Sequence, residues 1–231
     1  MAGQMLVNPQ MINYMSKIAN NYGGNYLEIG CYDGLTLSAM AESLKPRVCY
    51  GIDPFLGDVA VCPDMSRSDS IDGNFIPMPE QRRNLYENIS GHPNVSFYET
   101  TAEQFMNQRS QQELDDLNVT TVFVDGCHHT EYVKIDCMLS LLLIGRKKGA
   151  IIFDDMENEE VRNVVFELMQ FLEKHSFDFR PLGAFAIMPE ELVSDLRSLQ
   201  SEKIEFNAAS IDKTLRAPSG AVVVAAALEI N

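Results

Sequence analysis

Short apolar runs alternate along the chain with longer amphipathic stretches, which is the pattern of a parallel α/β sheet. The clearest run is Val119–Val124, where every residue is β-branched or aromatic, as in a strand that helices cover on both faces. The clearest helix is predicted from Glu157 to about His175, because its apolar residues recur every three or four positions and form one stripe.

The same alternation places the remaining elements. It predicts strands at Tyr26–Ile29, Val48–Ile52, Asn94–Tyr98, Val119–Val124, Ala150–Phe153, Phe177–Ile187 and Ala221–Ile230. It predicts further helices at Pro9–Asn20, Thr36–Leu44, Ala102–Arg109 and Tyr132–Ile144. Sheets built in this order are typical of α/β proteins with one hydrophobic core.

Two segments, Leu56–Pro79 and Pro189–Gly220, lack the alternation, although the second contains a helix-like piece at Glu190–Gln200. In one interpretation both are surface insertions in a single domain that spans residues 1–231. In the other, Leu56–Pro79 leaves the carboxyl end of the second strand and folds over the active site as a lid.

Composition narrows the choice of partners and location. The chain has 231 residues with 18 basic and 33 acidic side chains, a net charge of −15 that opposes binding to nucleic acid or to an anionic membrane. Its apolar runs are too short to span a bilayer, and its first residues do not resemble a signal peptide. We therefore expect a cytoplasmic protein whose five cysteines are reduced thiols.

Acidic residues stand at or near the ends of four predicted strands. They are Glu28, Asp53, Asp125 and the pair Asp154 and Asp155. In open parallel sheets, ligands bind outside the carboxyl ends of the strands. Because clustered carboxylates repel one another, we expect a cation or a hydroxyl-rich ligand among them.

The first strand leads into a glycine turn, Glu28–Gly34. Gly30 would let a ligand lie against the backbone, and the helix that begins near Thr36 presents free N–H groups to a carboxylate or phosphate. Asp53, at the end of the next strand, could bind both hydroxyls of a ribose. The spacing differs from that of dinucleotide-binding turns, which disfavours an oxidoreductase and favours another kind of nucleoside site.

Four segments carry a more specific resemblance: YLEIGCYDGLT at 26–36, GIDPF at 51–55, FVDGCHHTEYVKID at 123–136 and GAIIFDDM at 149–156. They resemble the class I S-adenosylmethionine-dependent methyltransferases, most closely the metal-dependent small-molecule O-methyltransferases of the macrocin or sugar type and the catechol type. The resemblance implies a Rossmann-like, doubly wound α/β sheet of seven mostly parallel strands, with an antiparallel last strand and helices on both faces. It also implies a homodimer, since such enzymes often form one.

The resemblance assigns the cofactor contacts residue by residue. The methionine portion of S-adenosylmethionine would be lined by Glu28, Gly30 and Tyr32, and its carboxylate would be held by Thr36. Asp53 would bind the ribose. The adenine would be bordered by Thr101 and Ala102.

Asp125, Asp154 and Asp155 end two strands and would bring three hard oxygen ligands together, which favours Mg²⁺ or a similar divalent cation. The family holds its metal ion at these positions. Asp154 has an alternative role as a cap of the next helix.

His128 lies three residues after Asp125, where catechol-type relatives have lysine and sugar-type relatives usually have histidine. We predict that His128 is the general base or orients the substrate, in a catalytic centre that includes Asp125. His129 is the less favoured substitute, and Cys127 stands where some sugar-type enzymes carry an acidic base.

These features favour an S-adenosylmethionine-dependent O-methyltransferase that acts on a hydroxyl of a sugar, polyol or phenol with the help of a divalent metal. Its partner would be a small-molecule acceptor, with no nucleic acid and no membrane. The alternative is a non-catalytic protein of the same fold that binds S-adenosylmethionine or a nucleoside.

Overall fold

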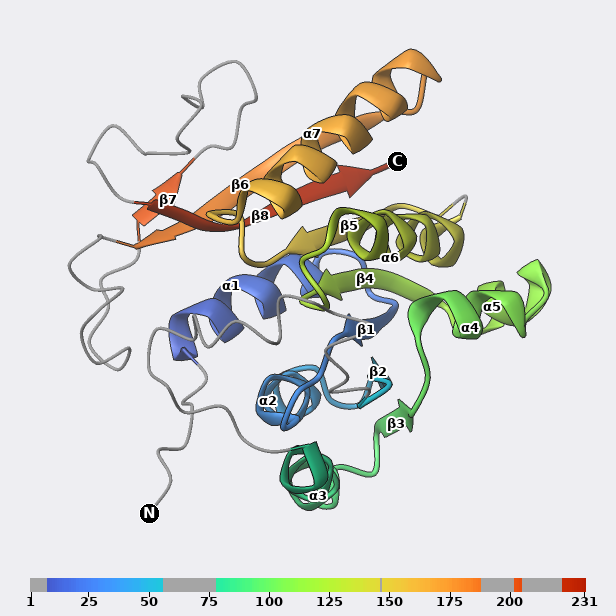
Figure 1. Cartoon of the computed structure of the whole chain (residues 1–231), viewed down its shortest axis with the longest axis vertical. Helices are drawn as coiled ribbons and strands as arrows, with labels where there is room; N and C mark the ends of the chain where they lie inside the picture. Colours follow the sequence, from blue (N-terminus) through green and yellow to red (C-terminus); the bar gives the residue numbers. More distant parts are fainter. Residues whose placement is uncertain (1–7, 56–77, 146, 188–201, 205–221) are drawn as a thin grey trace.

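A computed structural model describes residues 8–55, 78–145, 147–187, 202–204 and 222–231. These residues form one mixed sheet with the strand order β3-β2-β1-β4-β5-β8-β6-β7 (Figure 1). The strands are β1 (Asn25–Ile29), β2 (Cys49–Ile52), β3 (Val95–Tyr98), β4 (Val119–Val124), β5 (Gly149–Phe153), β6 (Phe179–Ile187), β7 (Glu202–Ile204) and β8 (Val222–Ile230).

The first five strands pair in parallel, whereas β8 runs antiparallel to both β5 and β6. The predicted fold class is therefore confirmed, and every predicted strand and helix in the described part lies within two residues of its observed bounds. The sheet differs from the prediction in one strand: β7, a three-residue edge strand antiparallel to β6, lies inside the predicted second insertion.

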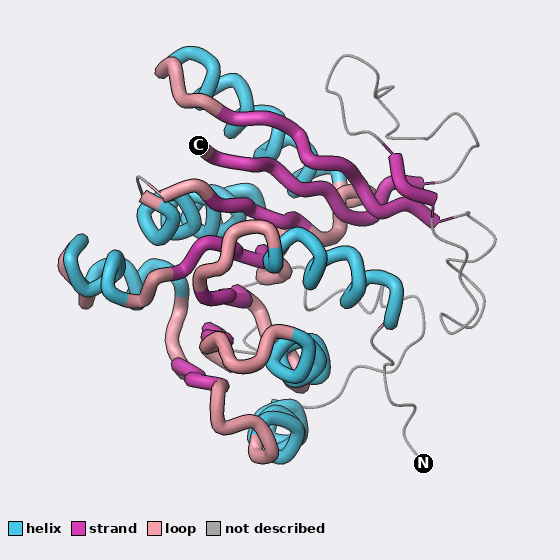
Figure 2. The backbone as a smooth tube through the Cα atoms, turned by 180° about the vertical axis from the view of Figure 1, so that it is seen from behind, coloured by secondary structure: helices cyan, strands magenta, loops and turns pink. Residues whose placement is uncertain are grey.

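Helices cover both faces of the sheet, as Figures 1 and 2 show from opposite sides. One face packs against α4 (Ala102–Asn107), α5 (Gln111–Asp116), α6 (Thr130–Ile144) and α7 (Glu159–Lys174). The other packs against α1 (Pro9–Asn20), α2 (Leu35–Ser43) and α3 (Met78–Ile89). No helix in the described part of the chain is long and apolar enough to cross a membrane.

The sequence pattern missed α3 and α5. The amino-terminal turn of α3 includes Pro79, which the prediction assigned to the end of the first insertion. The rest of that insertion, at 56–77, and most of the second one lie outside the described residues. The lid interpretation and the helix-like piece at 190–200 therefore remain predictions.

Local signals explain where the helices start. Asn8 caps α1, since its side chain accepts a hydrogen bond from the Gln10 N–H at 2.9 Å, and Pro9 occupies the first helical position. Asn158 caps α7 in the same way through the Glu160 N–H. Strand β4 is buried at all six positions, in agreement with its unbroken apolar and β-branched sequence.

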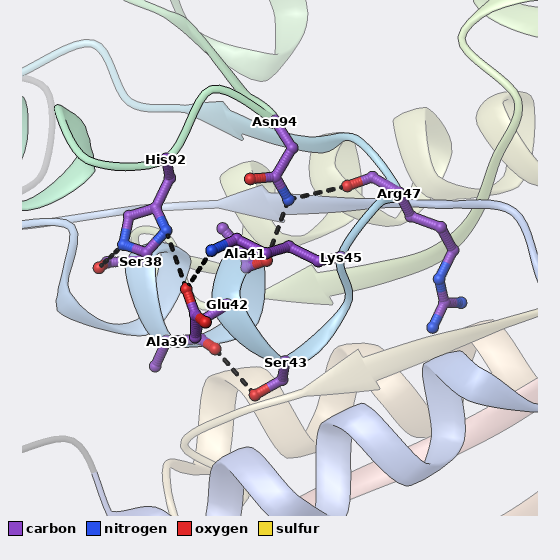
Figure 3. Close-up of polar contacts among 9 residues, drawn as sticks. All are labelled: Ser38, Ala39, Ala41, Glu42, Ser43, Lys45, Arg47, His92 and Asn94. Carbon is purple, nitrogen blue, oxygen red and sulfur yellow. Dashed lines mark hydrogen bonds and ion pairs between the residues drawn. The ribbon is translucent and has the colours of Figure 1, made fainter.

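A polar clip ties α2 to the segment that leads into β3 (Figure 3). The Asn94 side-chain amide donates to the carbonyl oxygens of Ala41 and Arg47, both at 2.9 Å, and the His92 Nε2 lies 2.8 Å from the Ser38 hydroxyl. These bonds hold α2 along the sheet, so that its first turn stays at the carboxyl end of β1.

A buried carboxylate joins the last strand to its neighbours. Glu229 in β8 is 3% exposed and accepts hydrogen bonds from the Tyr22 hydroxyl and the Arg180 Nε, both at 2.6 Å, with the Lys148 Nζ at 3.4 Å. Burial alone would raise the pKa of Glu229, but the bonds from Arg180, Tyr22 and Lys148 outweigh it and lower the pKa to about 2. Glu229 therefore stabilises the fold as an ionised group.

Replacing Glu229 by glutamine should lower the free energy of unfolding at pH 7 by about 1–3 kcal/mol, because it puts a buried neutral amide where Arg180, Lys148 and Tyr22 bind a carboxylate. A group whose folded pKa is depressed stabilises above its unfolded value, here 4.5, and loses that contribution as pH falls toward 2. Urea unfolding at several pH values measures the difference in free energy of unfolding between wild type and Glu229→Gln, which should shrink below pH 4.5. The exposed Glu42→Gln is the matched control, and an equal loss in both variants would contradict the assignment.

Candidate active site

The carboxyl ends of four strands meet at one edge of the sheet. The last residues of β1, β2, β4 and β5 pair in register, Ile29 with Ile52 and Val124, and Val124 with Phe153. The residues that follow these strands are consequently neighbours. They include Gly30, Asp53, Asp125 and Asp154, which the sequence analysis had singled out from separate motifs.

Gly30 allows the turn after β1 to touch the turn after β4. Its φ angle is +84°, and a Cβ atom there would lie 2.1 Å from the backbone oxygen of Asp125. Only glycine fits this position without moving the backbone. The predicted cofactor turn and the predicted metal loop therefore share one wall.

Asp53 organises the same turn from the end of β2. Its Oδ2 accepts hydrogen bonds from the Cys31 and Tyr32 N–H groups, both at 2.9 Å, and its Oδ1 accepts one from the Phe55 N–H at 2.8 Å. Tyr32 and Phe55 both adopt positive φ angles, of 48° and 47°. Burial raises the pKa of Asp53, and these backbone bonds oppose the rise. A carboxylate oxygen can accept two bonds, so Oδ1 retains capacity for a hydroxyl.

Glu28 lies beneath this turn and is 1% exposed. The Tyr26 hydroxyl donates to its Oε2 at 2.9 Å. Burial raises the pKa of Glu28 to about 8, with further repulsion from Asp53. A neighbouring cation would favour the ionised form of this carboxyl.

The other predicted cofactor residues surround the same edge. Thr36 lies in the first turn of α2. Thr101 caps α4, since its hydroxyl accepts from the Gln104 N–H at 3.1 Å, and Ala102 is buried behind it. Both follow β3, whose last residue pairs with Ile52 beside Asp53. Their placement next to the turn is consistent with the predicted adenine border, which stays a prediction.

Helix α3 supports the glycine turn, a contribution that the sequence analysis missed. A Cβ atom on Gly34 would lie 3.0 Å from the Leu85 side chain, so α3 packs directly on the turn. The Asn88 side-chain amide donates to the backbone oxygen of Asp33 at 2.9 Å. The few apolar positions of α3 gave no clear stripe by which to find it.

Asp125, His128 and Asp155 form the most compact group of possible metal ligands in the described residues. One ligand atom from each lies within 4.8 Å of the other two. The His128 Nε2 is 2.6 Å from Asp155 Oδ2, and Asp155 adopts a positive φ angle of 51°. The structure thus brings together two of the three predicted ligands and the predicted base. Asp154 lies outside this group.

Burial and electrostatic repulsion both raise the pKa values of the carboxyls in this cluster. Burial, and then repulsion from Asp154 and Asp155, raise the pKa of Asp125 well above its ordinary value. Burial and Asp155 do the same for Asp154, whereas His128 lowers the pKa. Glu157, which the sequence analysis did not select, joins the cluster: desolvation and repulsion from Asp155 raise its pKa to about 7.

The donor set fits a hard divalent cation. Two carboxylates and an imidazole offer oxygen and nitrogen ligands at one point, and the ionised forms of the surrounding carboxyls would carry more negative charge than His128 alone can balance. A bound cation would relieve the repulsion that raises these pKa values.

The cysteines correct one expectation. Cys31, Cys49 and Cys137 are free and buried, as predicted, but Cys127 takes part in a disulfide bond. The sulfur of Cys127 is therefore no nucleophile in this state. His129 is the N-cap residue of α6 and makes no capping bond with its side chain.

The fold and this edge together define a class I methyltransferase, and comparison with known proteins agrees. A family described as a methyltransferase domain matches residues 27–156, which is more than half of the chain. The chain therefore belongs to this methyltransferase family, as its motifs predicted. Among curated proteins, no sequence matches the chain significantly.

Solved structures share the fold at low sequence identity. An O-methyltransferase from Bacillus cereus in complex with SAH is 11% identical, with a TM-score of 0.55 and coverage of 99% of this chain and 84% of that one. TomG from Streptomyces achromogenes, an O-methyltransferase of tomaymycin synthesis in complex with SAM, is 12% identical (TM-score 0.55; 98% and 81%). CalS11, a TDP-rhamnose 3'-O-methyltransferase of calicheamicin biosynthesis, is 15% identical (TM-score 0.50; 75% and 73%).

Proposed function

We propose that the protein transfers a methyl group from S-adenosylmethionine to a hydroxyl of a small molecule, with a divalent cation such as Mg²⁺ held by Asp125 and Asp155. The observation that carries this proposal is the convergence of Asp125, His128 and Asp155 within 4.8 Å, on a loop that touches the Gly30 turn. Asp154 would contribute negative charge beside them or a further ligand.

The chain's own residues would bind the methyl donor and accept the proton of the acceptor hydroxyl. S-adenosylmethionine supplies the methyl group, and a bound divalent cation lowers the pKa of a hydroxyl that it contacts. His128 would donate from Nε2 to the Asp155 carboxylate, 2.6 Å away, and would receive the proton of the acceptor hydroxyl at Nδ1, and Asp155 would stabilise the imidazolium that forms. The turn at Gly30, Tyr32 and Asp53 would hold the donor beside them, which supplies proximity and alignment.

Two observations support a small hydroxyl-bearing acceptor. The acidic cluster suits a ligand that brings a cation and hydroxyl groups rather than phosphate-rich nucleic acid. Structures that share this fold include enzymes of small-molecule biosynthesis, one of which is a sugar O-methyltransferase by name. We therefore favour a sugar, polyol or phenol.

The test is acceptor-dependent release of S-adenosylhomocysteine by the full chain. Nucleotide sugars, free polyols and catechols would be offered separately, each with Mg²⁺ and each with a chelator. We expect one class to give turnover that the chelator abolishes. Calorimetric binding of S-adenosylmethionine without turnover on any class would instead support the binding-only alternative.

Several other expectations stay predictions. They are the single domain over 1–231 with insertions at 56–79 and 189–220, the cytoplasmic location and the homodimer.

A further inference from the structure

A carboxylate of α7 caps the helix that follows His128. The Glu160 Oε2 accepts two hydrogen bonds from Thr130, one from its backbone N–H and one from its hydroxyl, both at 2.8 Å. Thr130 is the first residue of α6, and the N-cap residue before it, His129, makes no side-chain capping bond. Glu160 therefore supplies from another helix the cap that α6 lacks locally.

This contact closes a ring around the candidate active site. His128 precedes Thr130 by two residues, and Asp155 precedes Glu160 by five. The two loops are joined at one point by His128 Nε2 and Asp155 Oδ2, 2.6 Å apart, and at a second point by the Glu160–Thr130 bonds. The position of the imidazole relative to Asp155 is thus set from both sides.

Other contacts act on the strands and on Cys127, the residue before His128, which is in a disulfide bond. The pairing of Val124 with Phe153, and the bond from the Asp154 N–H to the Val124 oxygen at 3.0 Å, fix where the two loops begin. Beyond Asp125 the chain makes a non-helical excursion before α6 begins. The Glu160–Thr130 bonds anchor the far end of this excursion to α7, and the Lys134–Glu167 ion pair, at 2.7 Å, joins the two helices one turn later.

We propose that Glu160 is a positioning residue, which holds the start of α6 through Thr130 and so places the His128 imidazole against Asp155. This inference rests on the proposed function for its consequence in catalysis. Loss of the contact should let the start of α6 move, and a displacement of about 1 Å at a reacting group can cost about 100-fold in rate.

The protein contains a matched control. In α5, Glu113 Oε2 also accepts from the N–H and the hydroxyl of one residue, Ser110, both at 2.7 Å. Helix α5 leads into the amino end of β4, at the opposite edge of the sheet from the site (Figure 1). Glu113→Ala therefore removes the same kind of cap with similar loss of stability, but far from His128.

The experiment compares Glu160→Ala, Glu160→Gln and Glu113→Ala in the full chain. Glu160→Ala should lower kcat by about 10–100-fold and leave the KM for S-adenosylmethionine unchanged. Glu160→Gln keeps an acceptor oxygen for Thr130 and should restore kcat to within a few-fold of wild type. Glu113→Ala should keep wild-type kcat. Equal kcat in Glu160→Ala and Glu113→Ala would overturn the proposal.

A second readout does not depend on turnover. The chain has four histidines, so the His128 imidazole resonances can be assigned by their loss in His128→Ala. Glu160→Ala should shift them and Glu113→Ala should not. If wild type transfers no methyl group, the proposed function fails, while an unchanged His128 signal in Glu160→Ala would refute the positioning role itself.

Discussion

Replacing His128 by alanine should lower kcat for methyl transfer by about 10²–10⁴-fold, the range expected when a general base is removed. The imidazole is the proposed proton acceptor, and it lies 2.6 Å from Asp155, on the loop that touches the predicted cofactor turn. The affinity for S-adenosylhomocysteine should stay unchanged, because Gly30 and Asp53 are held by backbone contacts that do not involve His128. Single-turnover methyl transfer and calorimetry measure the two quantities.

The adjacent histidine provides the control for this result. His129 has the same side chain one residue later, makes no capping bond and is absent from the compact ligand group. His129→Ala should therefore change kcat by no more than a few-fold. Similar losses of kcat in both variants would show that the loop tolerates no substitution at either position. Near-normal turnover by His128→Ala would show that His128 is not the general base.

Replacing Asp125 by asparagine should abolish turnover and at the same time stabilise the metal-free protein. The folded-state pKa of Asp125 is raised by burial and by Asp154 and Asp155, so its ionised form opposes folding at every pH above its unfolded value. Asparagine removes that charge and should raise the melting temperature by a few degrees, since about 1 kcal/mol corresponds to about 2–4 °C in a chain of this size. A stabilised but inactive variant marks a residue kept for function.

Added Mg²⁺ should reverse the order of stability. A ligand that binds only the folded state raises the melting temperature. Added Mg²⁺ should therefore raise the melting temperature of wild type and leave that of Asp125→Asn unchanged. Asp116→Asn, an exposed change on α5, should behave as wild type in turnover and in its response to Mg²⁺. Destabilisation of metal-free Asp125→Asn would contradict the proposed repulsion.

The sequence could predict which strand ends meet, and the physical reason is simple. Carboxyl ends of parallel strands lie at one edge of a sheet, so acids that close successive apolar runs must become neighbours. Asp53, Asp125 and Asp155 were found in this way from positions up to about a hundred residues apart. The confirmed family match has the same basis, since the motifs occupy these strand ends.

The detail of the site depends on features without a periodic signal. Asp155 joins Asp125 and His128 through a left-handed backbone angle of 51°, which no apolar pattern encodes. The contact from Glu160 to Thr130 spans 30 residues between two helix starts, and each residue alone looks like an ordinary first-turn side chain. The support of α3 for the glycine turn depends on Leu85 and Asn88 in an otherwise polar segment.

The proposed mechanism depends most on a divalent cation at Asp125 and Asp155. Calorimetric titration of Mn²⁺ into the protein saturated with S-adenosylhomocysteine tests this directly, with Asp155→Ala as the comparison. We expect one binding site per chain in wild type and its loss in Asp155→Ala. Equal binding by the two proteins, or no binding by wild type, would contradict it.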